Sequence, residues 1–454
     1  MYEKLIPFFK EWFKETETYG FSIPKEYGQV LGQEPDHIHF EKTFGEFIQR
    51  MKGNYPFHSP QYAGQMLKPP HPYAWFAYSL AMTINPNNHA LDGGPPSSEM
   101  EKEVMQELAE MVGYNNHFLG HLTSGGTVAN LEALWVAKCL HPKKKILYSA
   151  DAHYTHKRMA DVLGIESASV PVDDFGKIDV IKLEEVLPGA GTLVVTMGTT
   201  GRGVVDEFDK IVPMCKSHGV RIHVDAAYGG FFKIIEDNLQ NSTPWKSLSV
   251  ADSIVIDPHK HGLQPYGCGS VLFKDPEVGR FYKHDSPYTY FTSDNLHLGE
   301  ITLECSRPGA SAAALWFTIK TLGLTPESPF GNMLKDCIQA AGKFAEEIDQ
   351  SEYYSLIQQP ELDIVCYFPV ATSTSEITRL SKRIFDYGMK ESQEPFFLSL
   401  YKMPSSVITK KHPEIVVDQT EVTVLRSVFM KPSHKEYVKK LIIQLETAYV
   451  DCSE

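Results

Sequence analysis

The chain lacks the features that mark several large classes of protein. Its seven cysteines (139, 215, 268, 305, 337, 366 and 452) are scattered and form no Cys-x-x-Cys pair, so neither a disulfide framework nor a zinc site is expected. No apolar run approaches the length that crosses a membrane. The net charge is -14 and no basic cluster is longer than Lys143-Lys144-Lys145, which predicts a solvated turn. The sequence therefore favours a cytoplasmic protein without metal, membrane or nucleic-acid partners.

Length and composition indicate a large folded protein with an N-terminal arm. The 454 residues are 42% hydrophobic and 22% charged, enough for two or three structural units. We expect an arm over residues 1–55, a large domain over 56–322 and a small C-terminal domain over 323–454, with the turn-rich segment 323–329 at the second boundary. The arm should begin with an amphipathic helix over residues 1–13 that covers the protein body or a neighbouring subunit.

Strand-like and helix-like patterns alternate through residues 56–322, as an α/β fold with a mostly parallel sheet requires. The expected strands cover residues 145–148, 192–196, 221–224 and 253–256, and the expected helices cover 128–140, 153–163 and 207–218. The last 130 or so residues predict a small α+β domain, with strands over 363–368, 396–401 and 421–429 and helices over 375–387 and 434–449.

Two of the expected strands end in charged groups. Asp225 follows the apolar run 221–224, and Lys260 follows the run 253–256 within Asp257-Pro258-His259-Lys260-His261. Open α/β sheets bind ligands at such strand ends. A lysine that can form a Schiff base and a carboxylate that can hold a proton on a heteroaromatic nitrogen are the two groups that pyridoxal 5′-phosphate chemistry needs. Either residue alone would fit a surface lysine or a turn aspartate, but the pair predicts a cofactor site.

Neighbouring segments support this interpretation. Ser124-Gly125-Gly126-Thr127 precedes a helix-like run, so its backbone N–H groups and the helix dipole could face a phosphate. The small side chains of Ala226-Ala227 would let a flat ring lie close to the backbone. A cation next to Lys260, together with partial desolvation, is expected to favour the neutral amine. A glycine turn before a helix is common, so the phosphate site depends on Asp225 and Lys260.

The chain resembles the group II pyridoxal-phosphate-dependent amino acid decarboxylases. Three segments, residues 85–88 (NPNN), 123–130 (TSGGTVAN) and 306–313 (SRPGASAA), are most similar to the bacterial tyrosine decarboxylase branch. The resemblance implies a type I aminotransferase-like fold, with a mostly parallel seven-stranded large domain, a small C-terminal α+β domain, and a homodimer whose subunits share active sites. It implies decarboxylation of an L-amino acid, with an aromatic substrate such as tyrosine favoured. Aromatic residues that could line such a pocket are Tyr55, Phe57, Tyr62, Tyr73, Trp75 and Phe76.

The same resemblance assigns roles to residues around the cofactor. It places Ala227 against one face of the ring and His153 against the other, His259 within reach of the phosphate, and Thr200 near the ring substituents. By residue type alone, His153 would be a core or surface histidine, His259 an ordinary strand-end histidine, and Thr200 a turn threonine. The motif context therefore carries these three assignments.

Other assignments leave alternatives open. The family carries a loop tyrosine that protonates the product carbon, for which Tyr290 is the first choice and Tyr288 the second, although both could pack at a subunit interface. Arg426 lies near the substrate carboxylate or is an exposed strand arginine, and Arg307 shapes the neighbouring subunit's site or caps a turn. Two other functions remain: a carbon-carbon lyase for a phosphorylated amino alcohol, which needs a second phosphate site, and a non-enzymatic protein that retains the fold.

Overall fold

The computed structural model describes residues 37–90, 93–283 and 301–453 and divides the chain into two compact units, residues 1–59 and 60–454. In the first unit, helix α3 (His37–Lys52) carries an exposed ion pair between Arg50 and Glu46 at 2.6 Å. The amphipathic helix expected over residues 1–13 lies outside the described residues. The domain boundaries expected at residues 55 and 322 stay predictions.

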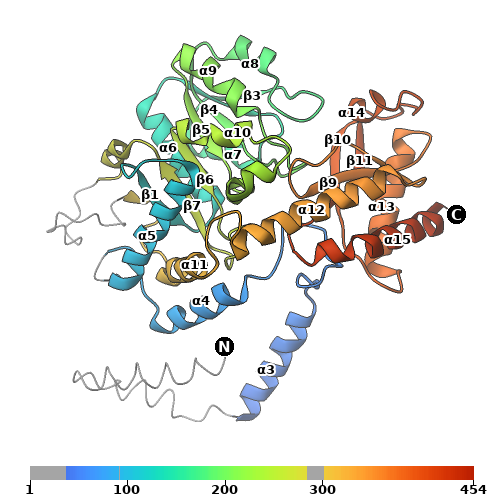
Figure 1. Ribbon diagram of the computed structural model, residues 1–454, viewed down its shortest axis with the longest axis horizontal. Helices are drawn as coiled ribbons and strands as arrows, with labels where there is room; N and C mark the ends of the chain where they lie inside the picture. The colour runs from blue at the N-terminus through green and yellow to red at the C-terminus, as the bar shows by residue number, and fades with distance from the viewer. Residues whose placement is uncertain (1–36, 91–92, 284–300, 454) are drawn as a thin grey trace. The chain divides into compact units, whose positions relative to one another are not determined.

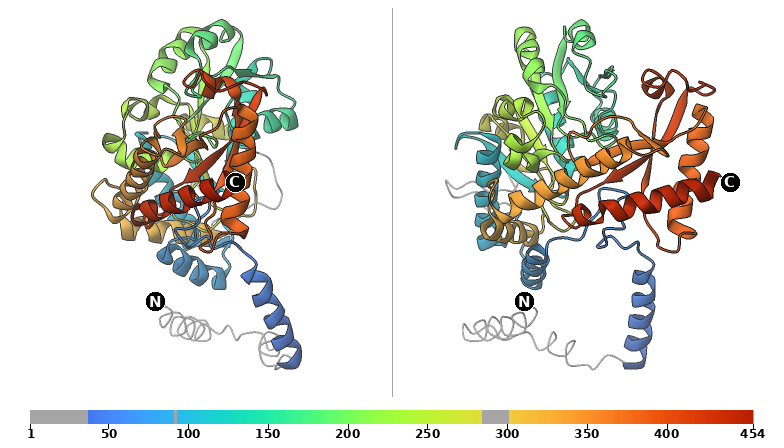
Figure 2. Two further views of the ribbon diagram at one scale, coloured as in Figure 1. Left: turned by 90° about the vertical axis from the view of Figure 1, so that its right-hand side faces the viewer. Right: turned by 45° about the vertical axis from the view of Figure 1, so that its right-hand side comes forward.

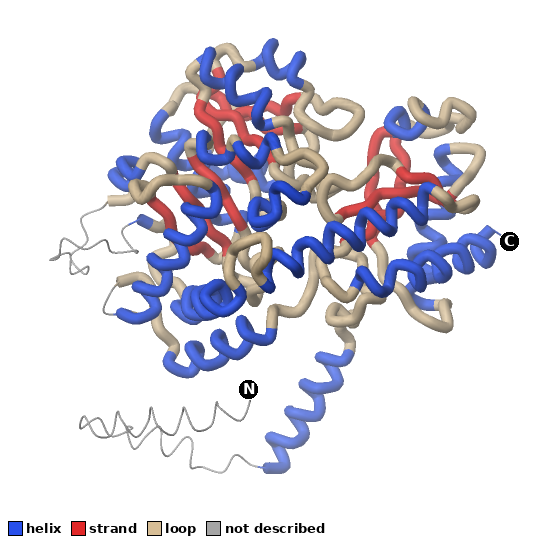
Figure 3. The backbone as a smooth tube through the Cα atoms, viewed as in Figure 1, coloured by secondary structure: helices blue, strands red, loops and turns tan. Residues whose placement is uncertain are grey.

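A seven-stranded sheet forms the centre of the second unit, in the order β1-β7-β6-β5-β4-β2-β3. Strand β7 is antiparallel to β1 and β6, and the other pairs are parallel. Helices cover the sheet (Figure 1, Figure 3), so its strand Ala190–Thr196, Ala-Gly-Thr-Leu-Val-Val-Thr, is buried on both faces and reads as an apolar run. The strands are β1 (Leu119–Thr123), β2 (Lys145–Ser149), β3 (Ser167–Val170), β4 (Ala190–Thr196), β5 (Arg221–Asp225), β6 (Ser253–Ile256) and β7 (Gly269–Phe273).

The connecting helices begin and end at residues suited to those positions. Gly219, in the left-handed region at φ 61°, ends α9 and turns the chain into β5, where a side chain would strain the backbone. The helices around the large sheet are α4 (Pro72–Ile84), α5 (Pro95–Val112), α6 (Gly126–Leu140), α7 (Thr155–Leu163), α8 (Val180–Val186), α9 (Phe208–His218), η3 (Gly230–Asn238), α10 (Thr243–Lys246), η4 (Leu248–Val250), η5 (Pro276–Phe281) and α11 (Gly309–Leu322).

A second, antiparallel sheet of four strands has the order β10-β11-β9-β8 and its own apolar core. Helix α12 is capped by the hydroxyl of Ser328 and runs from the large sheet to the small one (Figure 1, Figure 2). The elements are α12 (Pro329–Asp349), β8 (Tyr354–Leu356), β9 (Ile364–Pro369), α13 (Thr374–Lys390), β10 (Ser399–Pro404), α14 (Ser405–Thr409), β11 (Glu421–Val428) and α15 (His434–Ser453).

The structure confirms the fold class and nearly all of the predicted elements. One strand is displaced: it was expected over 396–401 but is observed at Ser399–Pro404. The residues before it pair elsewhere, because the Phe397 N–H donates to Gln61 and the Phe397 carbonyl accepts from Ala63. The predicted helix over 153–163 begins only at Thr155, which leaves His153 in the turn before it. Among the described residues, no helix has the length and apolarity needed to cross a membrane.

Candidate active site

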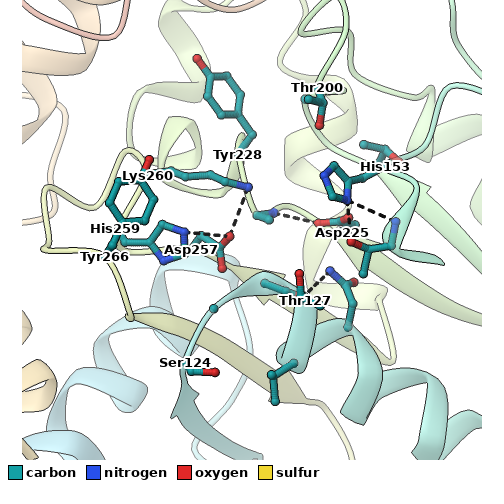
Figure 4. A pocket seen from close by; sticks show the side chains of 18 of the residues that line it. Ser124, Thr127, His153, Thr200, Asp225, Tyr228, Asp257, His259, Lys260 and Tyr266 are labelled. Atoms are coloured by element: carbon teal, nitrogen blue, oxygen red, sulfur yellow. Dashed lines mark hydrogen bonds and ion pairs between the residues drawn. The ribbon is translucent and has the colours of Figure 1, made fainter. Parts of the chain in front are cut away.

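A cavity of about 390 Å³ opens at the carboxyl ends of β4 and β5, against the N-terminus of α6 (Figure 4). Its volume is typical of small-molecule sites, which occupy roughly 300–1,000 Å³. The ten residues predicted to hold the cofactor all line it: Ser124, Gly125, Gly126, Thr127, His153, Thr200, Asp225, Ala227, His259 and Lys260. The sheet topology therefore brings together segments that lie up to 136 residues apart in the sequence, from Ser124 to Lys260.

Asp225 is the last residue of β5, and its carboxylate is held from two directions. The carboxylate accepts a hydrogen bond from the backbone N–H of Ala227 at 3.1 Å, and its other oxygen lies 2.8 Å from Nε2 of His156. Burial by itself would raise the pKa of Asp225, but the hydrogen bond from His156 and the nearby charge of Lys260 outweigh it and lower this pKa well below its usual range. The cavity therefore contains a permanent negative charge at this strand end.

His156 was missed by the sequence analysis. It lies in the first turn of α7, three residues after His153, and is completely buried. Its ring meets the ring of His223 edge to face at 6.5 Å, and His223 contacts Asn130 at 2.8 Å through Nε2. Burial lowers the pKa of His223 to about 3, so this ring is neutral. The sequence did show a second histidine about one turn after His153 on an expected helix. It did not show that this histidine contacts Asp225, which lies 69 residues away.

Lys260 lies in the connection between β6 and β7, beside a second buried carboxylate. Its ammonium group is 3.1 Å from Asp257, whose side chain is only 2% exposed. The expectation that a neighbouring cation would favour the neutral amine is therefore wrong, because the closest charged partner is an anion. His259 is not a cation either, since burial lowers its pKa. Oδ1 of Asp257 has no hydrogen-bond partner among the described residues, which leaves it available to a molecule in the cavity.

The glycine pair at the start of α6 allows close approach to the backbone. A Cβ atom on Gly126 would lie 2.6 Å from the Asp257 carboxylate, and one on Gly125 would lie 3.3 Å from the His259 ring. No side chain caps this helix, and its first residues line the cavity. The adjacent Ser124 N–H is already bound to the Glu304 carboxylate at 2.8 Å. The helix N-terminus and the glycines could together hold a phosphate, while the neutral His259 ring directs its Nδ1 to the Cys268 carbonyl at 2.7 Å.

His153 lies on the wall opposite this helix start, in the turn before α7. Its Nδ1 accepts a hydrogen bond from the backbone N–H of Thr155 at 3.3 Å and contacts the Thr155 hydroxyl at 2.6 Å. Burial is the main reason that the pKa of His153 is lowered, so the ring is neutral and free to stack on a flat ligand. Figure 4 shows His153 close to Asp225 and Thr200.

The two arginines considered from the sequence are both buried. Arg426, on β11, is 4% exposed, so the alternative of an exposed strand arginine is wrong. Its guanidinium donates to the carbonyls of Thr200 and Gly201 and to the Ser399 hydroxyl, which fixes the Thr200 turn against the small sheet. Arg307 pairs with Glu101 and donates to the carbonyls of Asn88 and Leu122.

The aromatic residues singled out from the sequence do not form the wall of the cavity. Of the four in the second unit, at positions 62, 73, 75 and 76, none is among the described residues that line it. The aromatic lining comes instead from Tyr154, Tyr228 and Tyr266. Tyr288 and Tyr290 lie outside the described residues, so the choice of the loop acid stays a prediction.

Comparison with known proteins agrees with the cofactor chemistry that the cavity residues indicate. The family model described as the pyridoxal-dependent decarboxylase conserved domain matches residues 51–369. A probable L-tyrosine/L-aspartate decarboxylase of Methanosphaera stadtmanae is 29% identical over 374 residues, which cover 80% of this chain and 92% of that protein. The L-tyrosine decarboxylase of Enterococcus faecium is 28% identical, with 78% and 77% covered.

Solved structures share the fold. The crystal structure of Oryza sativa TDC with PLP and tryptamine superposes with a TM-score of 0.79 at 16% identity, and covers 99% of this chain and 96% of that one. The match to the family model, which extends over most of the chain, agrees with a cavity that has a lysine, a carboxylate and a helix N-terminus on its walls. The chain therefore belongs to the pyridoxal-dependent decarboxylase family and is an amino acid decarboxylase that uses pyridoxal 5′-phosphate.

Proposed function

We propose that this decarboxylase acts on L-tyrosine or a similar uncharged aromatic amino acid, releasing the α-carboxylate as carbon dioxide and leaving the amine. The observation that supports an uncharged side chain is the cavity lining: among its described residues, Lys260 is the only lysine or arginine. An acidic substrate would need another cation for its side chain, because an unpaired buried carboxylate is costly. Three tyrosine rings supply apolar surface instead.

The names of two relatives give tyrosine and aspartate as candidate substrates. The Enterococcus protein is named for tyrosine, and the Methanosphaera protein for tyrosine and aspartate. Aspartate is therefore the substrate to set against tyrosine. The non-enzymatic alternative is wrong, because the family consists of enzymes, and the same membership favours decarboxylation over the carbon-carbon lyase reaction.

Each wall of the cavity has a role in this proposal. When bound, pyridoxal 5′-phosphate supplies the electron sink that accepts the electron pair left by the departing carboxylate. Lys260 provides the amine that anchors the cofactor covalently, and Asp225, kept ionised by His156, holds the proton on the ring nitrogen. Ala227 and the neutral ring of His153 would contact opposite faces of the cofactor ring, and Thr200 would lie near its substituents.

The phosphate end and the proton donor complete the assignment. The N–H groups at Gly126 and Thr127 would bind the phosphate, because a helix N-terminus attracts an anion, and the His259 ring would lie beside it. Gly125 takes part only if its N–H leaves the Thr123 hydroxyl, to which it donates at 3.3 Å. Ser124 takes part only if its N–H leaves Glu304. Tyr290, with Tyr288 as the alternative, donates the proton to the product carbon.

The substrate is tested by incubating the purified, cofactor-loaded protein separately with L-tyrosine, L-phenylalanine, L-tryptophan, L-aspartate and L-glutamate. Carbon dioxide release and the amine product are both recorded. The proposal expects the largest kcat/KM for tyrosine. A larger kcat/KM for aspartate would overturn the substrate assignment, and equal values for all five would show that the cavity does not select by side chain.

The anchoring role of Lys260 is tested by borohydride reduction and peptide mapping. Lys260→Ala protein should fold but lose the reducible link to the cofactor. Lys274 is the matched control, since it also lies close after a buried strand, β7, yet is not among the described residues of the cavity wall. Lys274→Ala protein should keep the link. A reduced adduct on any lysine other than Lys260 would contradict the assignment.

We also propose a homodimer with shared sites. Sedimentation of the loaded protein should give the mass of two chains. Mixing Tyr290→Phe subunits with Lys260→Ala subunits should restore part of the activity, because one hybrid site would have both residues intact. A monomer, or a mixture without activity, would contradict shared sites.

A further inference from the structure

A buried carboxylate outside the cavity contacts one residue that lines it and one that directly follows Lys260. Asp363 immediately precedes β9 and is completely buried. Its Oδ1 accepts a hydrogen bond from the Tyr228 hydroxyl at 2.6 Å, and its Oδ2 lies 3.0 Å from Nε2 of His261. All three side chains are at most 3% exposed, so water contributes little to this cluster.

Both partners of Asp363 are attached to the active site. Tyr228 lines the cavity three residues after Asp225, and His261 directly follows Lys260. The His261 ring also packs against Tyr228, with the ring centroids 4.8 Å apart, and against Phe232 at 4.6 Å. The peptide segment that carries Lys260 is therefore held by a side chain that has almost no freedom to move.

The carboxylate itself is fixed by the small sheet. The backbone carbonyl of Asp363 accepts a hydrogen bond from the Phe429 N–H at 2.8 Å, directly after β11. Asp363 thus belongs to the small sheet by its backbone and contacts the large sheet's loops by its side chain. This contact joins the two sheets next to Tyr228, which lines the cavity.

The charges that surround Asp363 favour its ionised form. Burial by itself would raise the pKa of Asp363, but His261, the Tyr228 hydroxyl and Lys68 together lower it. Lys68 is half-buried and donates to the Met430 carbonyl at 3.3 Å. Cys337 of α12 also faces Lys68, and burial raises its pKa to a value at which the thiol is neutral. Asp363 is therefore the anion of this cluster.

We propose that Asp363 is a positioning residue of the active site: by holding Tyr228 and His261 it fixes the cavity wall and the segment that presents Lys260 to the cofactor. The proposal rests on the assignment of Lys260 as the anchoring lysine. Asp363 does not touch the cofactor or the substrate, so it acts only through its two partners. Its carboxylate lies 3.0 Å from Nε2 of His261, the residue that directly follows Lys260.

The chain contains a second cluster of the same composition, which provides a matched control. Glu132 of α6 accepts a hydrogen bond from the Tyr282 hydroxyl at 3.1 Å and lies 3.0 Å from Nε2 of His121. Glu132 and His121 are fully buried, Tyr282 is 6% exposed, and none of the three is among the described residues of the cavity wall. Glu132→Gln and Asp363→Asn therefore make the same chemical change in the same kind of surroundings.

The experiment compares the two full-length variants, each loaded with pyridoxal 5′-phosphate. Both should lose stability to denaturant. Only Asp363→Asn should lower the pH midpoint of the bound cofactor's visible absorption band, by about 0.5 unit or more, because it removes the buried negative charge that contacts His261, the residue after Lys260. Its kcat should fall by about tenfold to a hundredfold, with a smaller change in KM, because reacting groups held slightly out of place lose rate.

Several outcomes would overturn the proposal. If Asp363→Asn loses stability but keeps the wild-type absorption midpoint and kcat, the cluster is merely structural. If Glu132→Gln moves the midpoint equally, the effect is not specific to the segment behind Lys260. Should Asp363→Asn fail to fold, Tyr228→Phe removes only the hydroxyl and must lower kcat. Wild-type kcat in Tyr228→Phe would refute the link.

Borohydride reduction separates this proposal from the assignment on which it rests. If the wild-type protein gives no adduct on Lys260, the proposed anchoring role fails. If the adduct forms on Lys260 in every variant while midpoint and kcat are unchanged, the anchoring role stands and the positioning role of Asp363 fails.

Discussion

Removing the imidazole of His156 should change both the stability and the pH response of the site. His156 lies 2.8 Å from the Asp225 carboxylate, and the other contact of that carboxylate is the Ala227 N–H at 3.1 Å. In His156→Leu the buried carboxylate keeps only the backbone contact. In His156→Gln an amide N–H of similar reach can still donate to it, so this variant is the matched control.

The magnitude follows from the kind of hydrogen bond that is lost. A hydrogen bond to an ionised group contributes about 1.5–3 kcal/mol, so His156→Leu should lower the free energy of unfolding by about that amount. The same loss should raise the pKa of Asp225 by about one to two units, because one unit corresponds to about 1.4 kcal/mol. Since this pKa begins well below its usual range, Asp225 should remain ionised at pH 7 and the cofactor should still bind.

The sign of the pH effect is fixed by the same pKa. Asp225 has a lower pKa in the folded chain than in the unfolded one, so its stabilising contribution is present above about pH 4 and is lost below that pH. Denaturant titrations of the apo-protein at pH 7 and at a pH well below 4 measure the contribution, and carbon dioxide release measures kcat. Equal stability of wild type and His156→Leu at pH 7, or equal damage in His156→Gln and His156→Leu, would refute the reasoning.

Three further predictions follow from the described contacts. Asp225→Asn should retain the cofactor but lose turnover by about a hundredfold or more, because an amide cannot keep the ring nitrogen protonated, and unchanged turnover would remove this residue from the mechanism. Gly126→Ala should weaken cofactor binding by about tenfold or more, since its Cβ would lie 2.6 Å from Asp257, whereas Gly342→Ala, whose Cβ meets nothing within 4 Å, should bind normally in the same equilibrium dialysis. Burial holds the pKa of His223 at about 3, so below about pH 6.5 this histidine binds a proton in the unfolded chain but not in the folded one. Its contribution should therefore lower the free energy of unfolding by about 2 kcal/mol between pH 6.5 and 5. Denaturant titrations should show a smaller pH dependence for His223→Gln.

The strands that carry the site could be predicted because their residues are apolar and β-branched. The runs that end at Asp225 and Lys260 are buried on both faces, and burial of that kind leaves a continuous apolar pattern in the sequence. Three strands of the large sheet were missed: β1 (Leu-Gly-His-Leu-Thr), β3 (Ser-Ala-Ser-Val) and β7 (Gly-Ser-Val-Leu-Phe). Glycine, histidine, serine and alanine give no continuous apolar pattern in β1 and β3, and the apolar run of β7 is only three residues long.

The residues that tune the site could not be predicted from local patterns. His156 and Asp363 have partners 69 and 102 to 135 residues away, and a contact of that kind depends on how the sheets are packed. The prediction of a cation next to Lys260 was wrong for the same reason. Asp257 lies three residues earlier in the sequence, but only the turn between the two residues brings its carboxylate to 3.1 Å from the Lys260 nitrogen. The resemblance to a family supplied the cofactor positions but not the charges behind them.

The reversal of direction between β6 and β7 has a consequence for the order in which the protein folds. Parallel neighbours in this sheet are joined through a helix, whereas β6 and β7 pair directly across the short connection 257–268. Within that connection, His259 binds the Cys268 carbonyl through its N–H at 3.0 Å, and the Ser270 hydroxyl binds the Ile256 carbonyl at 2.8 Å. Closing so short a loop costs little entropy, so the lysine-bearing segment can form early and without its ligand. Its amide hydrogens should therefore exchange slowly with solvent in the apo-protein, as those of a preformed site would.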